Sequence, residues 1–300
     1  MRTKHCRLWK RFLPLILALL LAGCSDSGSD QAGPISLKHL VKLPQHENQE
    51  TAPRFRMAVA AILSPQGTVE SYQPLVQYLE KTLGEQVVLV QRRSYEEINE
   101  LLARNGVDIA FICTGAYLEG WKKKQMTLLA VPRIDGKVTY KAFFIVSEAS
   151  GYTSFADLKG KKFAFTDPLS NTGYLYPISY MQSRGLNPEA YFSQTLFTYS
   201  HDRSIRAVME GMVDGASVDN LVFDYVCRRD PEVKSKVRVI RESDTFGMPP
   251  VVVPYQTPPE KKARLRQLLL TLDQSEEGRK VLETLGIQKF VTPDPALYRP

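Results

Sequence analysis

The feature that most constrains the fold is a repeated alternation of short apolar runs with amphipathic segments. Residues 54–61, 86–91 and 107–113 are short runs rich in apolar and β-branched side chains, which is typical of buried strands. Between them, residues 72–83 and 95–104 carry apolar side chains at helical spacing, and each stretch ends near a glycine. This order of strands and helices predicts a parallel sheet covered by helices on both faces, so we expect an α/β protein.

A second set of alternating segments follows residues 137–146. Its expected strands are residues 161–166, 194–199, 215–218 and 237–241, and its expected helices are residues 172–183, 201–210 and 221–228. The chain then returns through an apolar run at 251–254 to two closing helices at 259–272 and 276–285. A short internal similarity supports two related lobes, because LARNGVDIA at 102–110 and VMEGMVDGA at 208–216 both join a helix end to a strand through glycine.

The first 24 residues carry the marks of an export signal. Five basic residues without an acid precede an apolar run at 12–22, which is too short to span a bilayer comfortably. The run ends in Leu21-Ala22-Gly23-Cys24, which resembles the lipobox of bacterial lipoproteins; the alternative is an ordinary signal peptide with an incidental cysteine. We therefore expect a signal peptide at 1–23, lipidation of Cys24, a flexible tether at 24–52, and an extracytoplasmic or periplasmic location at the membrane.

The net charge of the chain is explained by the same segment. The full sequence has 39 Lys and Arg against 32 Asp and Glu, a formal charge of +7. Removal of residues 1–23 takes away five basic residues and no acids, which leaves 34 against 32, or +2. A nucleic-acid-binding protein needs clustered basic residues on its folded part, so no nucleic-acid partner is expected.

The cysteines and histidines indicate neither a metal site nor a disulfide framework. Cys113 and Cys227 are the two cysteines of the expected folded part, and both lie in apolar surroundings without a CxxC spacing. An oxidising compartment permits a bridge between them, but the surroundings favour two buried free thiols. The four histidines are scattered, so we expect no zinc site and no cofactor.

The segment KKFAFTDPLSNTGY at 161–174 is the most informative for function. It places Ser170, Asn171 and Thr172 between a strand and a helix, where the first backbone N–H groups of the helix lack partners. Such a helix start favours oxyanions, and Gly173 lets the backbone approach one closely. Plain N-capping of the helix explains the same residue types. This segment alone therefore leaves two interpretations open, an anion site and a simple helix cap.

A second strand–helix junction has the sequence Ser200-His201-Asp202. The ring of His201 can donate an N–H to an oxyanion without carrying a permanent charge. Capping of the helix together with Asp202 is the simpler alternative. Two helix starts with neutral donors in one lobe favour a shared anion. The three side chains are neighbours at a helix start and diverge, so they do not predict a catalytic triad.

Several of these motifs together resemble the periplasmic phosphate/phosphite/phosphonate-binding proteins of ABC transporters. They are the lipobox, DPLSNTGY at 167–174, SHDxSIxAV at 200–208 and GxVDGA at 211–216. The resemblance covers residue 54 to the C-terminus and implies a type II periplasmic-binding-protein fold, with two α/β lobes joined by a hinge and the ligand cleft between them. The expected lobes are residues 53–146 with 245–300, and residues 147–244.

The resemblance also implies a ligand site. Ser170, Asn171, Thr172 and His201 would hold the ligand oxygens, although family members often have Ser-Thr-Ser where this chain has Asn171 in the middle. In the other lobe, Tyr72 and Tyr117 match positions where the family has aromatic residues, with core packing as an equally weighted alternative.

Members that bind aminophosphonates place acids opposite the amine. Asp219 and Asp244 lie at expected strand ends near the mouth of the cleft, but a strand-end aspartate is more often a cap. The organic part of the ligand therefore stays open.

The function that the resemblance implies is the substrate-binding component of an ABC importer. It would bind a small tetrahedral oxyanion (phosphonate, phosphite or phosphate) and pass it to a permease in the inner membrane. A monomer that is not an enzyme is expected. A ligand sensor on the same fold, and less readily an enzyme on that fold, are the alternatives.

Overall fold

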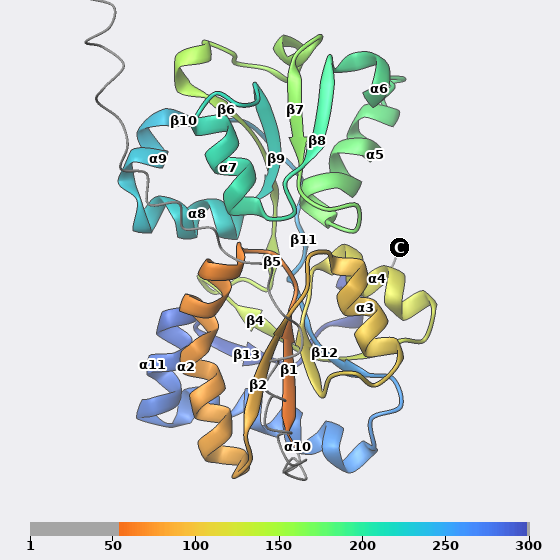
Figure 1. Ribbon diagram of the computed structural model, residues 1–300, viewed down its shortest axis with the longest axis vertical. Helices are drawn as coiled ribbons and strands as arrows, with labels where there is room; N and C mark the ends of the chain where they lie inside the picture. Colours follow the sequence, from red (N-terminus) through yellow and green to blue (C-terminus); the bar gives the residue numbers. More distant parts are fainter. Residues whose placement is uncertain (1–53, 299–300) are drawn as a thin grey trace, which may run out of the picture. The chain divides into compact units, whose positions relative to one another are not determined.

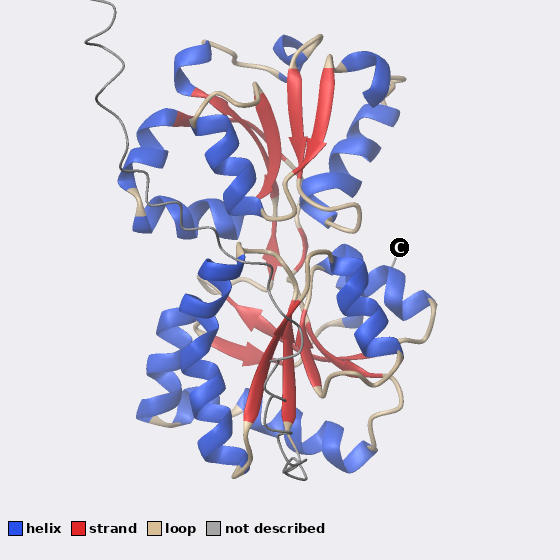
Figure 2. Cartoon of the chain, in the orientation of Figure 1, coloured by secondary structure: helices blue, strands red, loops and turns tan. Residues whose placement is uncertain are grey.

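The computed structural model describes residues 54–298. The predicted signal peptide, the lipidation site Cys24 and the whole predicted tether lie outside the described residues. Residues 54–298 form two main sheets, each flanked by helices, and one short two-stranded ribbon (Figures 1 and 2). None of the helices in this range combines the length and the apolar character needed to cross a bilayer.

The first lobe is built on a six-stranded sheet in the order β13-β4-β12-β3-β1-β2. Its strands are β1 (Phe55–Val59), β2 (Val87–Gln91), β3 (Ile109–Phe111), β4 (Met126–Arg133), β12 (Val251–Pro254) and β13 (Lys289–Val291). β1 runs parallel to β2 and β3, whereas β12 and β13 are antiparallel to their neighbours. Its helices are α2 (Pro65–Leu83), α3 (Tyr95–Ala103), α4 (Thr114–Lys122), α10 (Pro259–Leu270) and α11 (Glu276–Leu285), with short turns η5 (Leu272–Gln274) and η6 (Pro295–Tyr298).

The second lobe is built on a five-stranded sheet in the order β10-β6-β9-β7-β8. Its strands are β6 (Ala142–Ser147), β7 (Lys162–Phe165), β8 (Gln194–Phe197), β9 (Gly215–Asp219) and β10 (Val237–Glu242). Its helices are α5 (Tyr176–Gln182), α6 (Pro188–Tyr191), α7 (His201–Met209), α8 (Asn220–Arg229) and α9 (Pro231–Lys236), with short turns η2 (Glu148–Ser150), η3 (Phe155–Leu158) and η4 (Asn171–Leu175). β7 pairs in parallel with β8 and β9, as the sequence pattern predicts.

The chain crosses between the lobes twice. The two crossing segments pair as β5 (Thr139–Tyr140) and β11 (Phe246–Gly247), which are antiparallel. β6 already pairs with β9 and β10 of the second sheet. The boundary expected at residue 146 therefore falls inside a strand of the second lobe, because the continuous apolar run at 142–146 gave no sign of which sheet it joins.

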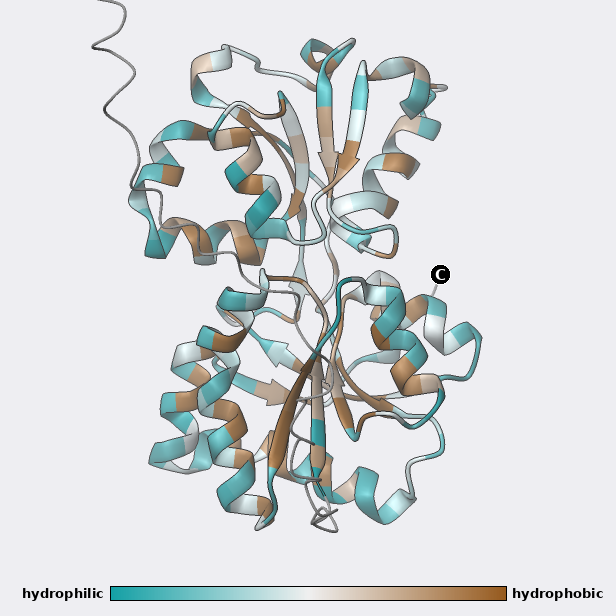
Figure 3. Ribbon diagram, in the orientation of Figure 1, coloured by the Kyte–Doolittle hydropathy of each residue, from teal (hydrophilic) through white to brown (hydrophobic). Residues whose placement is uncertain are grey.

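The apolar side chains of each lobe pack between its sheet and its helices. In the first lobe, Met57, Leu75 and Leu79 are fully buried between β1 and α2. In the second lobe, Phe144 and Phe163 are fully buried within an aromatic cluster. Figure 3 shows the matching pattern on the helices, which carry hydrophobic and hydrophilic patches in alternation. The predicted amphipathic segments thus owe their stability to one buried face each.

The Val-Asp pair that follows a glycine in each lobe has the same structural role in both. The Asp108 backbone N–H donates to the Arg56 carbonyl, and its side chain accepts the Arg56 N–H at 2.7 Å. The Asp214 N–H donates to the Lys162 carbonyl in the same way, and its side chain accepts the Lys162 N–H at 2.8 Å. Each aspartate therefore ties its strand to the first residues of the neighbouring parallel strand.

Local differences from the predicted elements have simple causes. α2 begins at Pro65 and not at residue 72, because Ser64 caps a first turn whose proline, glycine and threonine do not show the apolar periodicity. The sequence interpretation also passed over α4 and β4. Cys113 and Cys227 are both free thiols, but only Cys113 is buried. Cys227 is partly exposed, so the prediction of two buried thiols is wrong for Cys227.

Candidate functional site

The loop between β7 and the α5 region is built around Ser170. Ser170 is buried, and its hydroxyl oxygen accepts the backbone N–H of Gly173 at 3.0 Å. A side chain at Gly173 would lie 2.9 Å from that hydroxyl and closer still to Thr166, so only glycine fits. The tight turn leaves the side chains of Asn171 and Thr172 buried on the loop.

His201 lies at the start of α7 with its ring fully buried. Its Nδ1 accepts the backbone N–H of Asp219 at 3.1 Å, so the ring proton of the neutral imidazole belongs on Nε2. Nε2 lies 3.4 Å from the Ser170 hydroxyl. Burial lowers the pKa of His201 to about 3, so the ring is neutral at physiological pH. His201 is therefore a neutral ring that can donate one N–H.

Four side chains near this loop bear buried polar atoms without a hydrogen-bond partner among the described residues. Two come from the loop itself, the Asn171 amide nitrogen and the Thr172 hydroxyl. The other two are the hydroxyls of Tyr95, at the start of α3, and Tyr140, in β5. An unpaired buried polar group costs free energy, so four together indicate a site shaped for a polar ligand.

Electrostatic coupling shows that these groups are neighbours. Burial raises the pKa of Tyr95 well above its ordinary value, and the charges of Cys113, Asp167, Asp219 and Tyr140 raise it further. Burial also raises the pKa of Tyr140, while the polar side chains of Thr114 and Asn171 beside it act in the opposite direction. Tyr95 of the first lobe and Tyr140 of the crossing segment β5 thus lie close to polar groups of the second lobe, among them Asp219 and Asn171.

The site contains donors but no paired cation. Within residues 54–298, none of the ion pairs includes a residue of this group. Hydroxyl, amide and imidazole N–H groups can all donate to the oxygens of a tetrahedral anion. A buried anion held by such groups is recognised by hydrogen-bond geometry and not by bulk charge.

Asp219 adds a single acidic group at the end of β9. It is 3% exposed, and its carboxylate accepts the Leu221 N–H at 2.7 Å, which caps α8. Burial raises the pKa of Asp219 to about 7, because no cation compensates the loss of hydration. Asp219 also lines, together with Tyr72, a hollow of about 130 Å³ whose other walls are mainly apolar.

Of the remaining expected site residues, Tyr72 shares a hollow with Asp219, whereas Tyr117 and Asp244 lie elsewhere. Tyr72 packs edge-on against Phe111, with ring centroids 5.2 Å apart. Tyr117 is buried in the core of the first lobe, where it packs against Tyr298. Asp244 is exposed in the segment between β10 and β11. The structure therefore groups Ser170, Asn171, Thr172, His201 and Asp219, and it does not bring Tyr117 or Asp244 to them.

Tyr95 and Tyr140 are the residues that sequence reasoning missed. Tyr95 directly follows the capping residue Ser94 after β2, so it occupies the same kind of strand–helix junction that drew attention to the loop residues. Tyr140 lies in a crossing segment, where nothing local distinguishes it from a core tyrosine. The position of Tyr95 was a usable signal; that of Tyr140 was not.

A larger hollow of about 1050 Å³ is lined from both lobes. Its walls include Arg92 and Arg93 from the first lobe and Tyr199 and Arg203 from the second. Within the described residues, none of the three arginines forms an ion pair. With three arginines against the single acid Glu97, its wall carries a net positive charge.

Comparison with known proteins identifies the family. A family model described as "ABC transporter, phosphonate, periplasmic substrate-binding protein" matches residues 57–298. The chain belongs to this family. The phosphate-import protein PhnD of Mycolicibacterium smegmatis is 29% identical over 244 residues, which are 77% of this chain and 71% of that protein. The phosphonates-binding periplasmic protein of Escherichia coli is 26% identical over 260 residues, 85% of this chain and 76% of that protein.

Solved structures agree with the fold. A binding-protein component of an ABC phosphonate transporter from Pseudomonas aeruginosa has a TM-score of 0.77 and 25% identity, covering 82% of this chain and 83% of that one. PhnD1 from Prochlorococcus marinus, solved with methylphosphonate, has a TM-score of 0.73 at 16% identity, covering 82% and 94%. The type II periplasmic-binding-protein fold is confirmed.

Membership of this family confirms the predicted function. The protein is a periplasmic substrate-binding component of an ABC transporter of the phosphonate class, with a small-molecule ligand and a membrane permease as partners. The sensor and the enzyme that the sequence left open are not favoured by these relatives.

Proposed function

We propose that the protein binds a small aminophosphonate between its lobes, with the phosphonate oxygens on neutral donors and the ammonium group on Asp219. The observation that carries the proposal is the set of buried, unpartnered donors on Tyr95, Tyr140, Asn171 and Thr172. Ser170 and His201 complete the donor group, since Nε2 of His201 carries a proton and lies 3.4 Å from the Ser170 hydroxyl.

Asp219 supports the amine in particular. A buried carboxylate is stable only when a cation or several hydrogen bonds compensate its charge. Asp219 receives backbone hydrogen bonds at the start of α8 but has no ion-pair partner among the described residues, and its pKa is raised to about 7. An ammonium group on the ligand would supply the missing charge.

The first test is a binding panel measured by calorimetry. Phosphate, phosphite, methylphosphonate and 2-aminoethylphosphonate are titrated into the purified protein. The proposal expects 2-aminoethylphosphonate to bind at least roughly tenfold more tightly than methylphosphonate, the gain of about one charge-assisted contact. Equal affinity for the two phosphonates would contradict the pairing of an ammonium group with Asp219. If none of the four compounds bound, the proposed oxyanion site would be wrong.

Three substitutions test the donors. Tyr95→Phe, Tyr140→Phe and Thr172→Val each remove a hydroxyl that has no partner in the described residues. Each is expected to weaken phosphonate binding by roughly tenfold or more without lowering the melting temperature of the unliganded protein. Tyr191→Phe is the matched control. The Tyr191 hydroxyl lies outside the site, and it donates to the Phe155 carbonyl oxygen at a distance of 2.9 Å. This control should lower stability and leave affinity unchanged.

A transport role without catalysis is part of the same proposal. Asp202 accepts the Ser64 N–H, while Nδ1 of His201 accepts the Asp219 N–H, so Ser200, His201 and Asp202 do not form a relay. Phosphorus NMR of ligand incubated with the protein should therefore show an unchanged molecule. The appearance of a new phosphorus resonance would contradict this.

The finer points of location and assembly are also proposals. The sequence Leu21-Ala22-Gly23-Cys24 supports a lipid anchor on Cys24, and the ligand groups within a single chain support a monomer. Cys24→Ala should block incorporation of labelled palmitate, and light scattering of the soluble protein should give the mass of one chain. Labelling that survives this substitution, or a dimer mass, would contradict these points.

A further inference from the structure

Two aspartates from the motifs of the second lobe are not explained by ligand binding. Asp167 opens the loop that carries Asn171 and Thr172, and Asp202 directly follows His201. Both are acidic, so either one would repel an oxyanion if it faced the ligand directly. Their hydrogen bonds show that each carboxylate instead accepts a backbone N–H of the first lobe.

Asp167 spans the two lobes. Its Oδ1 accepts the Leu169 N–H at 2.8 Å within its own loop. Its Oδ2 accepts the Tyr95 N–H at 3.0 Å, the first helical N–H of α3 in the other lobe. The side chain is 1% exposed, so this bond lies away from water. A carboxylate at a helix start is favoured by the unpaired N–H groups and by the helix dipole.

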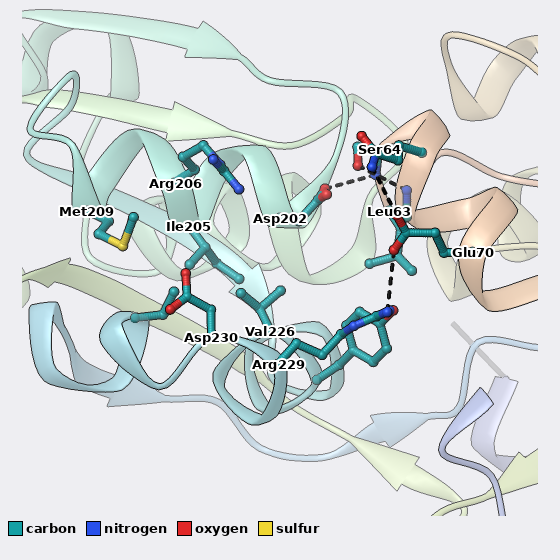
Figure 4. Close-up of a pocket in the computed structure, with 14 residues that line it drawn as sticks. Leu63, Ser64, Glu70, Asp202, Ile205, Arg206, Met209, Val226, Arg229 and Asp230 are labelled. Carbon is teal, nitrogen blue, oxygen red and sulfur yellow. Dashed lines mark hydrogen bonds and ion pairs between the residues drawn. The ribbon is translucent and has the colours of Figure 1, made fainter. Parts of the chain in front are cut away.

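Asp202 makes an equivalent contact at a second helix of the first lobe. Its Oδ1 accepts the Ser64 N–H at 2.9 Å, where Ser64 is the N-cap of α2. Figure 4 shows the Asp202 side chain reaching from α7 toward Ser64. Beside it, the His201 N–H donates to the Ile62 carbonyl at 3.0 Å.

We infer that Asp167 and Asp202 are positioning residues that couple ligand binding to closure, by accepting hydrogen bonds from the first residues of α3 and α2 of the first lobe only when the lobes are together. Each one is adjacent to ligand donors of its own lobe. Asp167 also holds the start of α3, whose first residue, Tyr95, supplies a donor hydroxyl. The hydrogen bond from the Tyr95 N–H to Asp167 therefore places the Tyr95 hydroxyl close to the ligand donors of the second lobe. This inference rests on the proposed function of the site.

The effect on ligand affinity follows from the fraction of molecules that can adopt the closed form. If only the closed form binds the ligand with all its donors, the apparent affinity is scaled by the fraction of molecules that can close. Loss of a charge-assisted hydrogen bond in the closed form alone lowers that fraction. The expected change is roughly tenfold to a hundredfold in Kd for each aspartate. Because the bonds form on closure, the change should be mainly in the dissociation rate.

The variants are Asp167→Asn, Asp202→Ala and the double variant. An amide has one oxygen, so Asp167→Asn can no longer serve both the Leu169 and the Tyr95 N–H with separate oxygens. Asp214→Ala is the matched control, because Asp214 accepts the Lys162 N–H within the second lobe only. It removes a carboxylate of the same kind without touching the other lobe.

Two readouts are needed. Calorimetry and stopped-flow kinetics with 2-aminoethylphosphonate and methylphosphonate should give a raised Kd and a faster dissociation rate for both single variants, a larger effect for the double variant, and no change for the control. Hydrogen exchange, measured without and with ligand, should show weaker protection at the Ser64 amide in Asp202→Ala and at the Tyr95 amide in Asp167→Asn, most clearly with ligand bound, when the lobes are together.

The outcomes separate the two proposals. Wild-type affinity and dissociation rate in the double variant would overturn the inference, as would unchanged exchange at both amides. If the wild-type protein bound no phosphonate, the proposed function would fail, and the exchange measurement would still decide whether the two aspartates hold the lobes together. If Asp167→Asn does not fold, Asp202→Ala, at a less buried position, gives the same test.

Discussion

Gly115 offers the sharpest test of lobe closure, because it is where the first lobe touches the ligand loop. A side-chain carbon at Gly115 would lie 3.0 Å from the Asn171 nitrogen, 2.8 Å from a Leu175 methyl group, and closer still to the Leu169 carbonyl oxygen. All three neighbours belong to the second lobe. Ala in place of Gly115 is therefore incompatible with the lobe contact as it stands.

The size of the effect can be worked from these contacts. A methyl group needs about 3.5 Å to its neighbours, so the two lobes must separate by roughly 0.5–1 Å at this point. The nearby Tyr95 N–H to Asp167 bond is 3.0 Å long and would be stretched beyond useful hydrogen-bond length. Loss of one charge-assisted bond corresponds to about 1.5–3 kcal/mol, so Kd should rise roughly tenfold to 150-fold.

Calorimetric titration of Gly115→Ala with 2-aminoethylphosphonate measures this directly. The melting temperature of the unliganded protein should not fall, since Ala is a better helix former than Gly within α4. Gly120→Ala is the control in the same helix, because its new carbon would meet only Met126 and Gln125 of the first lobe. The control should cost stability and keep affinity. Wild-type affinity in Gly115→Ala would refute the reasoning.

Other expectations concern charge and pH. Because Asp219 has a pKa of about 7 and only its ionised form can pair with an ammonium group, the affinity ratio of 2-aminoethylphosphonate to methylphosphonate should increase from pH 6 to pH 8. A ratio independent of pH, measured by calorimetry, would contradict the pairing. His201 has a pKa of about 3, below its unfolded value, so the unfolded chain binds the extra proton and stability should fall as the pH drops from about 6.5 toward 3. His201→Gln should flatten that part of the denaturation profile; an unchanged slope would show that other groups cause it. Neutralising Arg92, Arg93 and Arg203 together should slow phosphonate association several-fold at low salt and remove its salt dependence, with little change in dissociation, as stopped-flow mixing would show. An unchanged association rate would mean that these arginines do not guide the ligand.

Much of the fold was predictable because its signals are local. The strand at β3, the Ser94-capped helix α3 and the closing helix α11 all follow from periodicity, caps and glycines within a few residues. The lobe boundary was not predictable to the residue. β6 is apolar without a break over residues 142–146, and only its pairing with β9 and β10 shows which sheet it joins.

The ligand site, like the fold, could be predicted from the sequence only in part. The loop donors Ser170, Asn171 and Thr172 and the ring of His201 could be proposed from sequence, because a helix start creates a local need for polar side chains and a local preference for anions. The tyrosines are a different case. Tyr95 follows the capping residue Ser94 at a strand–helix junction, which was a usable signal, whereas nothing local distinguishes Tyr140 from a core tyrosine. Both pack in the same core as Tyr117, and only the structure shows that their hydroxyls are buried without a partner.

The amino-acid sequence by itself determined the α/β elements, the neutral donors of one lobe and the family, since these depend on patterns within short stretches of chain. Only the tertiary structure decided which residues of the other lobe meet those donors. Burial and the absence of a partner depend on atoms that lie close in space, and distant chain segments supply those atoms here: Tyr95 and Asp167 share one hydrogen bond across 72 residues. The same is true of the raised pKa of Asp219, which burial causes and which no stretch of sequence displays.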